Sequence, residues 1–162
     1  MKKFNVKHLY WMIPTLVIAI VMLVLECLPN GVEMVFKWPI DIDAGIFGSR
    51  TDYYPYFSGM PYNYANFAPI FIGIFTIAAI ILCVVNMFVD KMGIDIAVLV
   101  LNALKLICSS VEFTFSRTAI NWAVFALSLI LTIYSSVELA FKVKSKKSAV
   151  SPADTTTDVQ EN

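Results

Sequence analysis

Charged residues are scarce in this chain, and the side chains that most often carry out catalysis are scarcer still. Only 15% of its 162 residues are charged, whereas soluble domains have about 25%. There is one histidine, and Cys27, Cys83 and Cys108 are too far apart to form a C-x-x-C motif. Phosphate-binding glycine loops, H-E-x-x-H and G-x-S-x-G are also missing from the sequence. We therefore expect a protein that is not an enzyme and that uses no metal and no cofactor.

Charge of one sign is not in excess either, since twelve Lys and Arg residues balance twelve Asp and Glu residues. A chain without net charge has no overall field that attracts polyanions, so a nucleic-acid partner is not expected. Hydrophobic residues, by contrast, make up 59% of the chain, against roughly 45–50% in soluble domains. This composition predicts a membrane protein that is surrounded by the lipid bilayer.

Long apolar segments dominate the sequence. A helix that crosses roughly 30 Å of hydrocarbon needs about 20 mostly apolar residues, and helices are expected because backbone amides find no water there. The predicted fold is an all-α membrane protein, a four-helix transmembrane bundle with helices over residues 9–28, 67–89, 94–114 and 119–141. The remaining segments are 1–8, 29–66, 90–93, 115–118 and 142–162.

Lysine is concentrated on one side of these segments, which predicts their orientation. One set of flanks carries Lys2, Lys3, Lys7, Lys91, Lys142, Lys144, Lys146 and Lys147, and the other carries Lys37, Arg50 and Arg117. Positive residues favour the cytoplasmic side, so both termini and the turn 90–93 are predicted to be cytoplasmic. The tail 142–162 is polar and has no aromatic residue, and we expect it to be disordered.

Segment 29–66 is the longest connection and is rich in aromatic residues and turn formers. Val32, Met34, Phe36 and Trp38 alternate along the chain, which is typical of a β-strand. We expect a small folded extracytoplasmic cap on the outer helix ends, with a short β-hairpin as one possibility. Its aromatic residues form either the core of the cap and an interfacial belt or a recognition surface for a partner or lipid. They are Phe36, Trp38, Tyr53, Tyr54, Tyr56, Phe57, Tyr62 and Tyr64.

Polar residues inside the predicted spans are costly in lipid and mark a candidate site. The helical period of about 3.6 residues places Asp95, Asn102, Lys105, Ser109 and Glu112 on one stripe of the third span. Lys105 could pair with Glu112 or with Glu26 at the end of the first span, and Glu26 is favoured because that pairing joins two helices. The pairing either fixes helix packing or handles an anion or a proton.

A second, milder stripe lies on the fourth span. Asn121, Ser128, Thr132 and Ser135 share one face of that helix. Small hydroxyl residues allow close helix approach and hydrogen bonds between helices. We therefore expect this stripe to be a packing surface.

Two short motifs flank the predicted cap. Leu28–Val32 reads LPNGV, and Pro61–Pro69 reads PYNYANFAP. Together with the four-span layout, these motifs resemble bacterial four-span membrane proteins that have no assigned activity. The resemblance runs from the first span to the start of the second, and it implies the same topology in the bacterial inner membrane. The layout is also similar to tetraspan proteins such as claudins, but the paired loop cysteines of that family are missing.

Two functions follow from these features as expectations. The first is a non-enzymatic integral membrane protein whose outer cap contacts a membrane partner, an extracytoplasmic partner or lipid. The alternative is a small transporter or channel that uses the polar stripe around Lys105. Four helices rarely enclose a pathway alone, so the alternative implies an oligomer.

Overall fold

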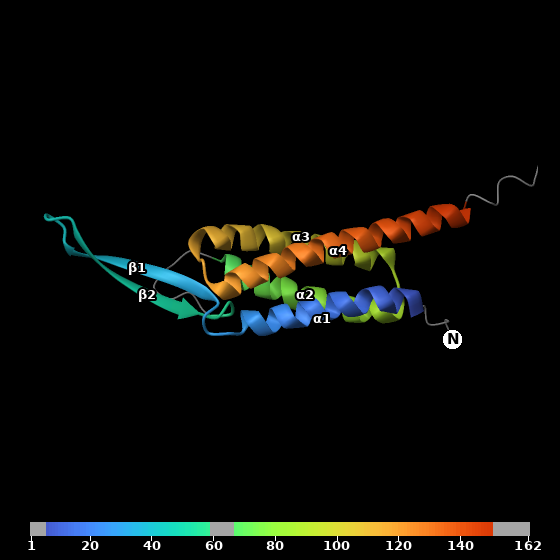
Figure 1. The fold of residues 1–162 in the computed structure, drawn as a ribbon, viewed down its shortest axis with the longest axis horizontal. Coiled ribbons are helices and arrows are strands. Elements are labelled where there is room, and N and C mark those ends of the chain that lie inside the picture. The colour runs from blue at the N-terminus through green and yellow to red at the C-terminus, as the bar shows by residue number, and fades with distance from the viewer. Residues whose placement is uncertain (1–5, 59–66, 151–162) are drawn as a thin grey trace, which may run out of the picture.

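The computed structural model describes residues 6–58 and 67–150, with side chains described over residues 10–58 and 67–145. Within these ranges the chain forms four helices and one two-stranded sheet. The helices lie side by side, and the sheet extends from one end of them (Figure 1), here called the hairpin end. The elements are α1 (Val6–Glu26), β1 (Val32–Asp41), β2 (Ile46–Tyr54), α2 (Ala68–Val89), α3 (Met92–Phe115) and α4 (Ala119–Val150).

Three of the helices are long and apolar enough to cross a membrane, over Ala68–Val89, Met92–Phe115 and Ala119–Ser145. The apolar part of α1 found over the described side chains, Tyr10–Glu26, is shorter than these three. The outward faces of the three long helices expose aliphatic side chains, as lipid requires. The fold is therefore consistent with a helical membrane protein, and a crossing by α1 stays a prediction.

The helices pack in a ring. Helix α1 packs against α2 and α4, and α3 packs against the same two helices. Helix α1 begins and α4 ends at the same end of the molecule, opposite the hairpin (Figure 1). Both ends of the described chain therefore lie on one side, and the cytoplasmic location of that side stays a prediction.

The predicted disordered tail is partly wrong, because α4 continues from residue 141 to Val150. The added segment contains four lysines, and lysine is a good helix former. Lys142 also forms an ion pair with Asp95, which holds this part of α4 against α3, and a second one with Glu138 of its own helix. Residues 151–162 of the expected tail lie outside the described residues.

The other helix boundaries differ by a few residues from those expected. Helix α1 begins at Val6, inside the predicted terminal segment 1–8, and ends at Glu26. The predicted turn 90–93 is reduced to two residues because Asp90 adopts the left-handed conformation, with φ 46° and ψ 58°, and ends α2 there. The chain can then reverse at once, and α3 begins at Met92.

The hairpin considered in the sequence analysis is present. Strands β1 and β2 are antiparallel, with Val32 opposite Tyr54 at the base and an irregularity between Pro39 and Asp41. In the connecting turn, the Asp41 carboxylate accepts hydrogen bonds from the backbone N–H groups of residues 43 and 44. Gly45 follows with a φ of 67°, a conformation that glycine adopts at little cost.

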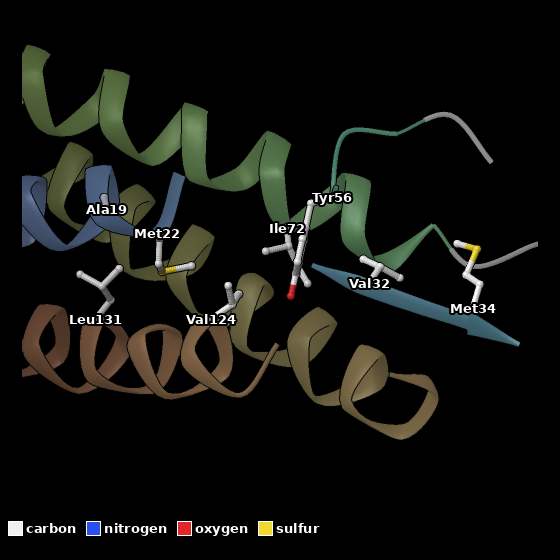
Figure 2. Close-up of a cluster of buried hydrophobic side chains, with 8 residues drawn as sticks. All are labelled: Ala19, Met22, Val32, Met34, Tyr56, Ile72, Val124 and Leu131. Carbon is white, nitrogen blue, oxygen red and sulfur yellow. The ribbon is translucent and has the colours of Figure 1, made fainter. Parts of the chain in front are cut away.

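A hydrophobic cluster joins the base of the hairpin to the helices (Figure 2). Gly31 makes close packing possible, because a Cβ atom there would lie 2.7 Å from the ring of the buried Tyr56. Beyond this base the hairpin projects away from the helices (Figure 1), so the expected cap is seated only at its root. The cluster consists of Ala19, Met22, Val32, Met34, Tyr56, Ile72, Val124 and Leu131.

Candidate functional site

The buried face of α3 is almost entirely polar. Val98 is its one apolar member, and the others are Asp95, Asn102, Lys105, Ser109 and Glu112. The structure therefore buries every position of the stripe expected on the third span. Lipid can cover only the opposite face of α3, so these polar groups must be satisfied by other helices or by a bound polar ligand.

At the end opposite the hairpin, the charge of Asp95 is neutralised by Lys142. The Lys142 ammonium donates to both carboxylate oxygens of Asp95, at 2.8 and 2.7 Å, and Asn86 donates to the same carboxylate. Glu138 lies 3.3 Å and Asp90 lies 3.6 Å from the ammonium. The ion pair of Lys142 with Asp95 was not predicted, because Lys142 was expected to lie in the disordered tail. The spacing of four residues from Glu138 was the signal that could have placed Lys142 on the helix.

At the hairpin end, a second network joins the hairpin to the α3–α4 turn. The Tyr56 hydroxyl donates to Oδ1 of Asn121 at 2.9 Å, and the Asn121 amide donates to the Ser116 carbonyl at 2.6 Å. The Ser116 hydroxyl in turn accepts from the backbone N–H of Glu33 in β1 at 2.9 Å. Tyr56, Asn121 and Ser116 are fully buried. The base of the hairpin is thus held to the helices by polar as well as apolar contacts.

The phenol of Tyr56 is held in its neutral form. Burial, together with the nearby carboxylates of Glu112 and Glu26, raises the pKa of Tyr56 well above its usual range. A neutral hydroxyl can donate a hydrogen bond to Oδ1 of Asn121, as the geometry requires.

The predicted packing stripe of α4 makes contacts both within α4 and with other helices. Ser135 accepts from the Asn102 amide of α3 at 2.9 Å, and the Ser128 hydroxyl lies 4.0 Å from the sulfur of Met22 in α1. Thr132 donates to the Ser128 carbonyl of its own helix at 2.8 Å. Two members of the stripe therefore contact neighbouring helices, which is the geometry of a packing surface.

Lys105 and Glu26 lie between the two end networks. Both side chains are fully buried, and the two charges are within electrostatic reach of each other. One Glu26 oxygen accepts from the Thr76 hydroxyl at 2.7 Å. The other oxygen and the Lys105 ammonium find no hydrogen-bond partner among the described residues. The favoured partner of Lys105 is thus nearby without bonding to it directly.

The outer-loop aromatic residues divide between core and surface. Tyr56 is in the core, and Phe36 and Tyr54 are half-buried against it. Trp38, Tyr53 and Phe57 are exposed. The first three residues thus fit the expected core role, and the exposed three are available for the expected recognition surface. Tyr62 and Tyr64 lie outside the described residues.

The distal half of the hairpin is apolar and exposed. Around the turn, Ile42 is 78% exposed and Ile40 is 64% exposed. Trp38, Ile46 and Phe47 are exposed beside them. The Trp38 indole packs on Gly48 of the opposite strand, where a Cβ atom would lie 2.5 Å from the ring. We call Trp38, Ile40, Ile42, Ile46 and Phe47 the hairpin tip.

Comparisons with protein-family models, with curated proteins and with solved structures find no match to this chain. The resemblance to bacterial four-span proteins therefore stays a prediction. Most of its second motif, residues 61–66, also lies outside the described residues. The hairpin tip and the polar interior are the two features from which a function can be inferred.

Proposed function

We propose that this is a non-enzymatic protein of the bacterial inner membrane whose hairpin tip docks an extracytoplasmic partner protein. One observation carries the proposal: the tip keeps five apolar side chains exposed on a hairpin that projects beyond the helices (Figure 1). Apolar side chains on the helix exteriors are covered by lipid, but those at the tip are not. Several apolar side chains exposed to water at the end of a projecting element are typical of a protein interaction site.

The charges near the tip favour a protein partner over a membrane. Asp41 and Asp43 lie in the turn between the apolar residues, and they would be repelled by anionic headgroups. The matching surface on the partner protein is an apolar groove with a basic rim. Such a groove would cover Ile42 and Phe47 and would attract the two carboxylates.

The anchoring of the hairpin supports a binding role. Tyr56 and Ser116 fix its base to the helices, and the packing of Trp38 on Gly48 stiffens the hairpin where the tip begins. A surface that is already ordered loses little conformational entropy when a partner binds. The hairpin is therefore suited to hold the tip at a set distance from the helices.

Site-specific photocrosslinking in cells tests the proposal. A photoreactive amino acid at position 42 should give a discrete protein adduct, whereas the same group at Ile107, an exposed position on α3, should label lipid. The adduct should disappear in the double variant I40S/F47S. The captured protein should then bind the purified membrane protein in nanodiscs at least tenfold more tightly than it binds I40S/F47S. Adducts with lipid alone, or only with a second copy of the chain, would contradict the proposal.

A further inference from the structure

Three buried polar atoms between the two end networks complete no hydrogen bond with the described residues. They are Nζ of Lys105, Oε2 of Glu26 and Oδ1 of Asn102. Lys105 and Asn102 are three residues apart on the same buried face of α3, and Glu26 reaches Lys105 electrostatically from α1. The three atoms therefore belong to one region of the helix interior.

The chemistry of these atoms restricts what can bind among them. The Lys105 ammonium can only donate hydrogen bonds, whereas Glu26 Oε2 and Asn102 Oδ1 can accept them. A bound anion would meet the Glu26 carboxylate, and a bound metal cation would meet the Lys105 ammonium. Water both accepts and donates, and buried water usually binds where protein polar groups lack partners. Water is therefore the ligand that suits all three atoms.

We propose that water bound at Lys105 links its ammonium to Glu26 and Asn102, and that this hydrated site carries protons through the helix interior. In the transfer step, an N–H bond of the Lys105 ammonium breaks and its proton passes to water. The same water gives a proton to the Glu26 carboxylate, forming an O–H bond. The products are a neutral amine and a carboxylic acid, and the reverse step restores both charges.

Polar side chains continue from this site toward both ends of the helices. Ser109 and Glu112 lie on the buried face of α3 toward the network of Asn121 and Tyr56. In the other direction, Asn102 bonds Ser135, and the ion pair of Lys142 and Asp95 follows. Titratable groups from every packed element lie along this course, namely Glu26, Tyr56, Cys83, Asp95, Lys105, Glu112, Glu138 and Lys142.

Proton flux into liposomes that contain the purified protein tests this inference. With a pH-sensitive dye inside and a potassium diffusion potential imposed by valinomycin, the wild-type protein should acidify the lumen faster than protein-free liposomes. Lys105→Met removes the ammonium and should lower the flux at least tenfold. Glu26→Gln should do the same. Lys91→Met is the matched control, because this exposed lysine precedes α3, and it should leave the flux unchanged.

A direct measurement of hydration supplements the flux. Solid-state NMR of lysine labelled with ¹⁵N at Nζ should show magnetisation transfer from water to the Lys105 ammonium in lipid. A wild-type flux equal to that of protein-free liposomes would overturn the inference, as would full flux in both Lys105→Met and Glu26→Gln. Absence of water transfer to Nζ would also overturn it. If Lys105→Met does not fold, Glu26→Gln and Asn102→Leu decide the outcome. I40S/F47S should retain the flux, so this inference and the docking proposal can fail separately.

Discussion

Tyr56, which follows the second strand of the hairpin, donates its hydroxyl hydrogen to Oδ1 of Asn121 at the start of α4, at 2.9 Å and away from solvent. This bond spans 65 positions in sequence and connects the base of the hairpin to the helices. The Asn121 amide continues the connection to the end of α3. Movement of the hairpin base is thus tied to the α3–α4 turn.

Replacement of Tyr56 by Phe should destabilise the protein. The variant removes one hydroxyl and leaves Oδ1 of Asn121 buried without its donor, which costs about 1–3 kcal/mol. Thermal unfolding in detergent should show a lower midpoint. Tyr53→Phe is the matched control, since Tyr53 is 52% exposed, and it should change the midpoint little. Equal midpoints for Tyr56→Phe and wild type would contradict the role of this bond.

The raised pKa of Tyr56 predicts a loss of stability at high pH. The folded state holds the phenol proton more tightly than the unfolded state, where the pKa is near the usual 10.0. The stabilisation is therefore complete below pH 10 and is lost as the pH rises above it. The free energy of unfolding should fall less steeply above pH 10 in Tyr56→Phe than in wild type. Parallel curves for the two proteins would refute this prediction.

Gly31→Ala should disturb the hairpin base. The new Cβ atom would lie 2.7 Å from the ring of Tyr56, which is fully buried and has little space to move. Overpacking of this kind costs about 1–3 kcal/mol. Gly93→Ala in α3 is the control, because its Cβ would meet nothing within 4 Å. Hydrogen exchange of the amides in β1 should accelerate in the first variant and not in the second.

Lys142→Met should strongly destabilise the end opposite the hairpin. It removes the cation that compensates Asp95, and an uncompensated buried charge of this kind costs about 3–5 kcal/mol. The double variant K142M/D95N should recover part of the loss, because the remaining group is neutral. Thermal unfolding of the wild type, K142M, D95N and K142M/D95N gives the coupling free energy between the two side chains. Additive losses would show that the ion pair contributes nothing beyond its separate members.

The hairpin and the buried stripe could be anticipated because each depends on local periodicity. Val32, Met34 and Phe36 alternate as a strand does, and Asn102, Lys105 and Ser109 recur at helical spacing. Tertiary partners were harder to infer. Tyr56 could not be distinguished from the exposed Tyr53, since burial depends on Gly31 and Asn121, which are distant from it in sequence.

The end of α4 was missed for a different reason. Lys142 was assigned to a disordered tail because segment 142–162 is polar and has no aromatic residue. Its positive charge is needed by Asp95, which is 47 positions earlier in the chain. A polar residue can therefore extend a helix when a distant opposite charge is buried beside it.

The polar face of α3 also affects how the chain can enter the membrane. Released alone, α3 would place Lys105 in hydrocarbon near the centre of the helix, at a cost of roughly 2.5–3.5 kcal/mol. Only Asp90 and Lys91 separate α3 from α2, whose high apolarity favours insertion. The two helices should therefore leave the translocon as one unit. The polar face of α3 can then be fully buried only after α4 has been synthesised, because Lys142 of α4 pairs with Asp95 of α3.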